Sequence, residues 1–111
     1  MESLRVGVIG LGLIGSLHAR ILSEIPNAEL ISVADVNGAL SNDIAEKYGC
    51  KHYTDYRDLC NAGDLDAVCI CTPDPFHKEI AIYAAKKGLH LLIEKPLSET
   101  AADAWDIVAA A

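Results

Sequence analysis

The sequence predicts an α/β fold with a doubly wound parallel sheet. Short apolar segments alternate along the chain with segments of helical periodicity, and the turns between them are short. The first apolar segment is followed directly by glycines in the spacing G-x-G-x-x-G, at Gly10, Gly12 and Gly15. Parallel strands joined by right-handed crossovers account for this alternation. We therefore expect one Rossmann domain over residues 1–111, with about five strands in the order 3-2-1-4-5.

Each expected strand is a nearly continuous apolar run, as in a sheet covered on both faces. The strands are expected over residues 4–9, 30–34, 51–53, 67–71 and 89–93. Each expected helix has apolar residues three or four positions apart, and the first four have a glycine or proline just after their ends. The helices are expected over residues 14–25, 39–48, 55–61, 76–87 and 98–111, with an extended loop over residues 72–75.

The glycine turn predicts a nucleotide-binding site. Gly10 allows a tight turn, Gly12 leaves room for a pyrophosphate against the backbone, and Gly15 allows close packing of the helix. The N–H groups that open this helix, around Leu13 and Ile14, have no partners within the helix and attract phosphate.

Asp35 predicts the kind of nucleotide. It follows Gly15 by about 20 residues, at the end of the second strand, where a carboxylate binds both ribose hydroxyls of an adenosine. Neither arginine nor lysine occurs in Val36-Asn37-Gly38, and a carboxylate repels a 2′-phosphate. We therefore expect NAD rather than NADP, with Val36 among the cofactor-binding residues. The alternative is that Asp35 only begins a turn.

Composition excludes several kinds of partner. The net charge is −7 and basic residues do not cluster, which argues against nucleic acid and anionic membrane surfaces. The sequence contains no stretch long enough to span a membrane. The four cysteines are interpreted as free buried thiols, which favours a cytoplasmic location. The histidines and cysteines show no ligand spacing, so we expect no metal site.

The fourth strand leads into a second candidate loop. Thr72, Pro73 and Asp74 are expected to pass over the cofactor, mainly with their backbone, and the prolines order this loop before binding. His77 is placed with the cofactor-binding residues, although a structural role at the start of the helix is the better interpretation. His18 lies on the inner stripe of the first helix and is interpreted as a packed core histidine.

The sequence contains four motifs: residues 8–15 with His18, residues 33–35, residues 71–73 with His77, and residues 88–97, which include Glu94-Lys95-Pro96. Together they resemble the amino-terminal domain of the glucose–fructose oxidoreductase and inositol dehydrogenase family. The resemblance implies an NAD(P)-dependent dehydrogenase that transfers hydride between a nicotinamide and a hydroxyl or ketone of a sugar or cyclitol. It implies that Lys95 is catalytic and hydrogen-bonds the reacting oxygen, and that Glu94 helps to place it near the cofactor. It also implies a carboxy-terminal substrate domain, and a homo-oligomer in the full-length protein.

The end of the sequence predicts an amino-terminal fragment. The expected helix over residues 98–111 has no capping glycine and no basic residue in its final turn. A sixth strand and the second domain are therefore expected to be missing, and catalysis by this chain alone is not expected. Two alternatives remain open: a free-standing redox sensor or regulatory module, and a non-redox Rossmann domain for another nucleotide.

Overall fold

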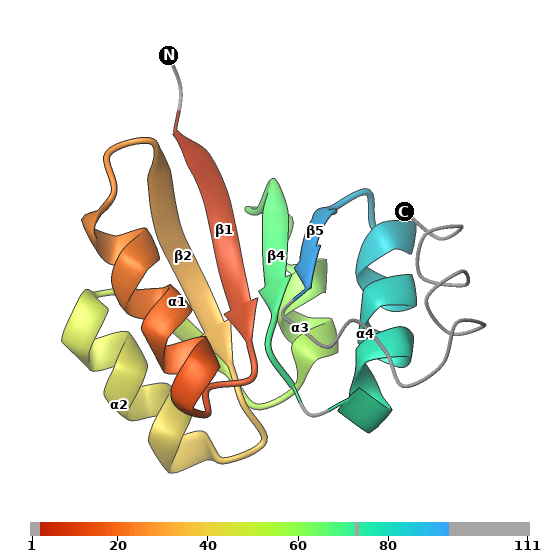
Figure 1. Cartoon of the computed structure of the whole chain (residues 1–111), viewed down its shortest axis with the longest axis horizontal. Helices are drawn as coiled ribbons and strands as arrows, with labels where there is room; N and C mark the ends of the chain where they lie inside the picture. Colours follow the sequence, from red (N-terminus) through yellow and green to blue (C-terminus); the bar gives the residue numbers. More distant parts are fainter. Residues whose placement is uncertain (1–2, 73, 94–111) are drawn as a thin grey trace.

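A computed structural model describes residues 3–72 and 74–93 as a five-stranded parallel sheet flanked by helices (Figure 1). The strand order is β3-β2-β1-β4-β5, as the sequence predicted. Parallel pairing joins β1 to β2 and β4, β2 to β3, and β4 to β5. The strands are β1 (Leu4–Ile9), β2 (Ala28–Ala34), β3 (Lys51–Tyr53), β4 (Ala67–Ile70) and β5 (His90–Ile93). The helices are α1 (Leu13–Glu24), α2 (Gly38–Tyr48), α3 (Tyr56–Asn61) and α4 (Asp74–Lys86).

The helices cover both faces of the sheet, α1 and α2 on one and α3 and α4 on the other (Figure 1). Alternating strand residues divide between two cores, since successive side chains point to opposite faces. The core under α1 and α2 contains Val8, Val33 and Cys69. The core under α3 and α4 contains Ile9, Ala34, Val68 and Ile70, together with Leu59 of α3 and Ile80 of α4.

The beginning of α4 differs from the prediction. Residues 74 and 75 were expected in an extended loop, but the helix begins at Asp74 and contains Pro75 in its first turn. Proline is tolerated there because the first N–H groups of a helix have no intrahelical acceptor, and its φ already suits the helix. Smaller differences concern β2, which begins two residues earlier than expected, and β4, which ends one residue earlier.

Pro73 and the predicted helix over residues 98–111 lie outside the described residues. In the described part of the chain, no helix combines the length and hydropathy that crossing a membrane requires.

Candidate functional site

A cleft of about 1040 Å³ lies at the carboxyl ends of β1, β2 and β4. This is the end of a doubly wound sheet at which ligands bind, where the chain crosses from one face to the other. Hydrogen bonds continue the sheet to this edge: Gly10 N–H donates to Ala34 O and Cys71 N–H donates to Ile9 O, both at 2.8 Å. A second cavity of about 560 Å³ lies at the opposite strand ends, between Arg5, Glu29 and Asp64, away from the glycine turn.

The backbone conformation at Gly10 and close contacts within the protein at Gly10 and Gly15 require glycine at these two positions. Gly10 has a φ of 90°, and a Cβ on it would lie 2.7 Å from the Thr72 nitrogen. A Cβ on Gly15 would collide with the Gly10 carbonyl oxygen and would lie 3.3 Å from the Cβ of Cys71. The predicted turn at Gly10 is thus confirmed. Gly15 allows α1 to approach the turn and the end of β4.

Gly12 has a different environment. A Cβ built on it has no protein atom within 4 Å, so nothing in the described structure requires a glycine there. Gly12 is also the N-cap of α1 and provides no side-chain hydrogen bond to the helix. The first N–H groups of α1 therefore open toward the cleft, next to the exposed Leu13 and Ile14. This combination fits a phosphate, which would accept these hydrogen bonds and occupy the space that a side chain would fill.

The Asp35 carboxylate lies between the ends of β1 and β2. Its Oδ2 accepts a hydrogen bond from Leu11 N–H at 2.7 Å, and its Oδ1 accepts one from Asn37 N–H at 2.8 Å. An ionised carboxylate has about four acceptor positions, so each oxygen keeps capacity for a further donor. Asp35 therefore begins a turn, as the alternative interpretation held, and can still accept hydrogen bonds from ribose hydroxyls.

The other predicted site residues are placed as follows. Val36 is 91% exposed and lines the cleft, and so does Thr72, whose buried hydroxyl has no hydrogen-bond partner among the described residues. His77 is buried on the inner face of α4, in line with Ile80, and is not one of the residues that line the cleft. Asp74 begins α4. Pro73, Glu94 and Lys95 lie outside the described residues.

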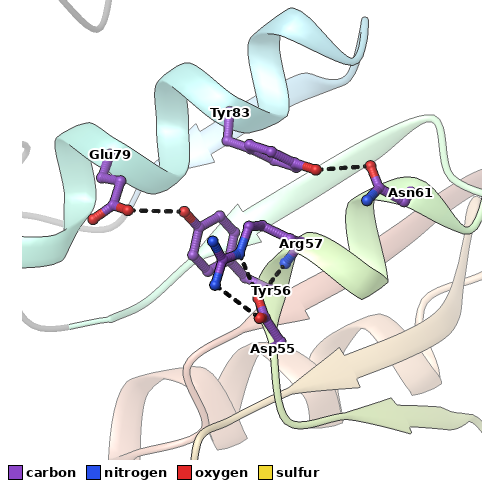
Figure 2. Close-up of polar contacts among 6 residues, drawn as sticks. All are labelled: Asp55, Tyr56, Arg57, Asn61, Glu79 and Tyr83. Atoms are coloured by element: carbon purple, nitrogen blue, oxygen red, sulfur yellow. Dashed lines mark hydrogen bonds and ion pairs between the residues drawn. The ribbon is translucent and has the colours of Figure 1, made fainter.

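Sequence reasoning missed the wall of the cleft that α3 and α4 form. Arg57 pairs with Asp55 through its Nε at 3.1 Å and a terminal nitrogen at 3.0 Å (Figure 2). This pair holds the pKa of Asp55 below its usual range. The Tyr56 hydroxyl donates to Glu79 at 3.2 Å, and burial followed by the Glu79 charge raises the pKa of Tyr56 (Figure 2). The missed lining residues are Thr54, Asp55, Tyr56, Arg57, Phe76, Glu79 and Ile80. The predicted strand order places the third strand beside the second. This order could have indicated that the segment after β3 lies at the cleft.

The structure also groups side chains that the sequence spacing did not. Ligand atoms of His18, Cys69 and Cys71 all lie within 4.8 Å of one another. The absence of ligand spacing along the chain therefore gave no sign of this group, and the expectation of no metal site stays a prediction. The three side chains meet because α1 packs across the end of β4, a contact that spacing along the chain does not reveal. None of the four cysteines forms a disulfide, as predicted, although Cys50 and Cys71 are only half-buried.

Comparisons with known proteins agree with this geometry. Residues 4–111 match the family model described as "Oxidoreductase family, NAD-binding Rossmann fold". The chain is 41% identical over 101 residues to myo-inositol 2-dehydrogenase of Thermotoga maritima, covering 90% of this chain and 30% of that protein. The crystal structure of a probable dehydrogenase from Thermotoga maritima has a TM-score of 0.92 and 39% identity, covering 96% of this chain and 32% of that one.

A further structure relates the fold to bound ligands. Scyllo-inositol dehydrogenase from Lactobacillus casei, solved with bound cofactor NAD(H) and scyllo-inositol, has a TM-score of 0.91 and 26% identity, covering 98% of this chain and 33% of that chain. The chain thus spans about a third of the length of these relatives. None of these three is named as a sensor or regulatory subunit, so that alternative gains no support from them.

Proposed function

Because this chain belongs to the oxidoreductase family with an NAD-binding Rossmann fold, we propose that it supplies the cofactor-binding part of a longer dehydrogenase acting on a cyclitol or sugar. The family membership confirms the resemblance inferred from the sequence. The proposal of a longer enzyme is supported by the relatives, which are about three times the length of this chain. Their names support the substrate class.

The observation that carries the proposal is the open space at Gly12. Contacts within the protein explain Gly10 and Gly15, whereas no such contact explains Gly12, which a bound pyrophosphate would account for. The α1 N–H groups would hold that pyrophosphate, and Asp35 would hold the adenosine ribose. The bound nicotinamide would supply hydride transfer, while the protein supplies binding and orientation.

The preference for NAD over NADP rests on the charges that line the cleft. Asp35 places a negative charge where a 2′-phosphate would lie. Arg57 is the cation on the cleft wall in the described structure, but the Asp55 carboxylate already holds its guanidinium. A 2′-phosphate would therefore meet one carboxylate directly and an arginine that another carboxylate neutralises.

Lys95 is proposed as the catalytic residue on the resemblance of Glu94-Lys95-Pro96 to the family motif. An ammonium group there would stabilise negative charge on the reacting oxygen. The same resemblance supports the further proposal that the full-length protein is a homo-oligomer.

The proposed cofactor site is tested by NADH titration of the 111-residue chain and of two glycine variants. Gly12→Ala should leave the free energy of unfolding almost unchanged, because the added methyl meets no protein atom within 4 Å. It should weaken NADH binding by roughly tenfold or more, because the methyl occupies the pyrophosphate position.

Gly63→Ala is the matched control. Gly63 has a φ of 78° and does not line the cleft, so alanine there should cost about 1–2 kcal/mol of stability without changing NADH affinity. Undiminished NADH binding by Gly12→Ala would refute the proposed pyrophosphate position.

A further inference from the structure

His18, Cys69 and Cys71 form a compact group between α1 and the end of β4. The Sγ atoms of Cys69 and Cys71 are 3.5 Å apart, and the ligand atoms of all three residues lie within 4.8 Å of one another. Cys69 is completely buried, whereas His18 and Cys71 are half-buried. One ligand is therefore fixed in the core and two remain reachable from outside.

These separations suit a tetrahedral zinc ion. With Zn–S bonds of about 2.3 Å and Zn–N bonds of about 2.0 Å, neighbouring ligand atoms of a tetrahedron are roughly 3.5–3.8 Å apart. The observed Sγ–Sγ distance is close to this value, and the limit of 4.8 Å leaves only small side-chain adjustments. Two cysteines and one histidine also form a set that binds zinc with a fourth position left for water.

A disulfide suits the pair less well. Two residues of extended chain span about 6.6 Å between Cα atoms, near the upper limit for disulfide-bonded cysteines. Two sulfur atoms that bind the same cation do not have to approach to the length of an S–S bond. Two thiolates and a neutral imidazole would also balance the charge of Zn²⁺, so the complex would carry no net charge into the buried end of β4.

We propose that His18, Cys69 and Cys71 form a binding site for Zn²⁺ or a similar thiophilic cation beside the nucleotide cleft, whose lining includes Cys71. The bound ion would join α1 to β4 directly behind the glycine turn, because the Cβ of Cys71 lies against Gly15. This proposal does not depend on the proposed function, since it requires only the three side chains. It predicts that zinc stabilises the folded chain, because the ligands come together only when α1 packs on β4.

The test uses the reduced 111-residue chain, with Co²⁺ as a spectroscopic probe and Zn²⁺ as competitor. One Co²⁺ should bind per chain, with thiolate charge-transfer absorption and the intense visible bands of a four-coordinate site, and Zn²⁺ should displace it. Cys71→Ser and His18→Ala should weaken Zn²⁺ binding by roughly 100-fold and 10-fold. Cys50→Ser is the matched control, since Cys50 packs against the same core but lies outside the group.

Cys69→Ser places a hydroxyl in the core and can prevent folding. The conclusion therefore depends on the Co²⁺ spectrum of the wild-type chain and on Zn²⁺ binding by Cys71→Ser. A Co²⁺ spectrum without thiolate charge transfer would overturn the proposal. Zinc binding of equal strength in the wild-type chain and Cys71→Ser would also overturn it, because the ion would then be held by other surface groups.

Discussion

The Asp35 carboxylate accepts a hydrogen bond from the Leu11 N–H at 2.7 Å, which ties the end of β2 to the glycine turn after β1. Leu11 is 1% exposed, so water cannot replace this acceptor. Asp35 therefore has two roles in the proposed site: it holds the turn in place, and it presents negative charge to the nucleotide. Two substitutions separate them.

Asp35→Ala should remove both roles. A buried N–H left without an acceptor costs about 1–3 kcal/mol, so the free energy of unfolding should fall by that amount. NADH affinity should fall by roughly tenfold, and the gap between NADH and NADPH should narrow. Asp35→Asn can keep an acceptor for the buried Leu11 N–H, while the exposed Asn37 N–H turns to water, so it should retain more stability while losing the charge. Asp43→Asn, on the exposed surface of α2, controls for net charge. Equal affinity of the parent chain for NADH and NADPH would refute this assignment of Asp35.

Asp55 and Arg57 give a second prediction about cofactor preference. The Asp55 carboxylate binds the guanidinium and also caps α3 by accepting a hydrogen bond from Arg57 N–H at 2.9 Å. Asp55→Asn keeps a good capping residue but weakens the ion pair. The released Arg57 should raise NADPH affinity several-fold and leave NADH affinity nearly unchanged, as measured by fluorescence titration.

The double variant Asp55→Asn/Arg57→Gln is the control for this effect. It should lose the gain in NADPH affinity, because no guanidinium remains to meet the 2′-phosphate. If the double variant keeps the gain, Arg57 is not its source.

Gly10 and Gly15 should respond to substitution through stability. Gly10→Ala introduces a side chain at a φ of 90° and places its Cβ 2.7 Å from the Thr72 nitrogen. Gly15→Ala forces its Cβ into the Gly10 carbonyl oxygen, which requires α1 to move away from the turn. Each should lower the free energy of unfolding by at least about 2 kcal/mol in urea denaturation, with Gly15→Ala the more severe. A Gly15→Ala chain as stable as the parent would contradict the observed approach of α1 to the turn.

The sequence was sufficient to predict the features of the fold that depend on local patterns of residues. Strand β1, the turn at Gly10 and the position of Asp35 follow from apolar runs and glycine spacing, and the strand order follows from the alternation of elements. The predicted beginning of α4 was wrong because proline has two opposing effects. It disfavours helical conformation in the residue before it, but it is tolerated in the first turn of a helix.

The features that were missed depend on contacts between distant parts of the chain. Arg57 reaches the cleft because β3 lies beside β2, and its pairing with Asp55 depends on side-chain geometry. The group of His18, Cys69 and Cys71 forms only after α1 docks on the sheet. Hydrophobic periodicity predicts which face of a helix is buried, but not which polar side chains meet beneath it.

Acid pH should destabilise the chain through carboxylates such as Asp66. Asp66 accepts hydrogen bonds from the Arg5 backbone N–H at 2.9 Å and from its guanidinium at 3.0 and 3.3 Å, joining the beginnings of β1 and β4. These bonds hold the pKa of Asp66 below its usual range in the folded chain.

A pKa that is lower in the folded than in the unfolded chain stabilises the fold above the unfolded value, and this contribution disappears as the pH falls through the folded value. The free energy of unfolding should therefore decline below about pH 4, the usual range for aspartate. Asp66→Asn should reduce the dependence of the free energy of unfolding on pH, since asparagine does not titrate. Asp43→Asn controls for the loss of one exposed carboxylate. The measurement is urea denaturation at a series of pH values from 7 to about 3. An Asp66→Asn chain with the same pH dependence as the parent would show that the Arg5–Asp66 pair contributes nothing to acid stability.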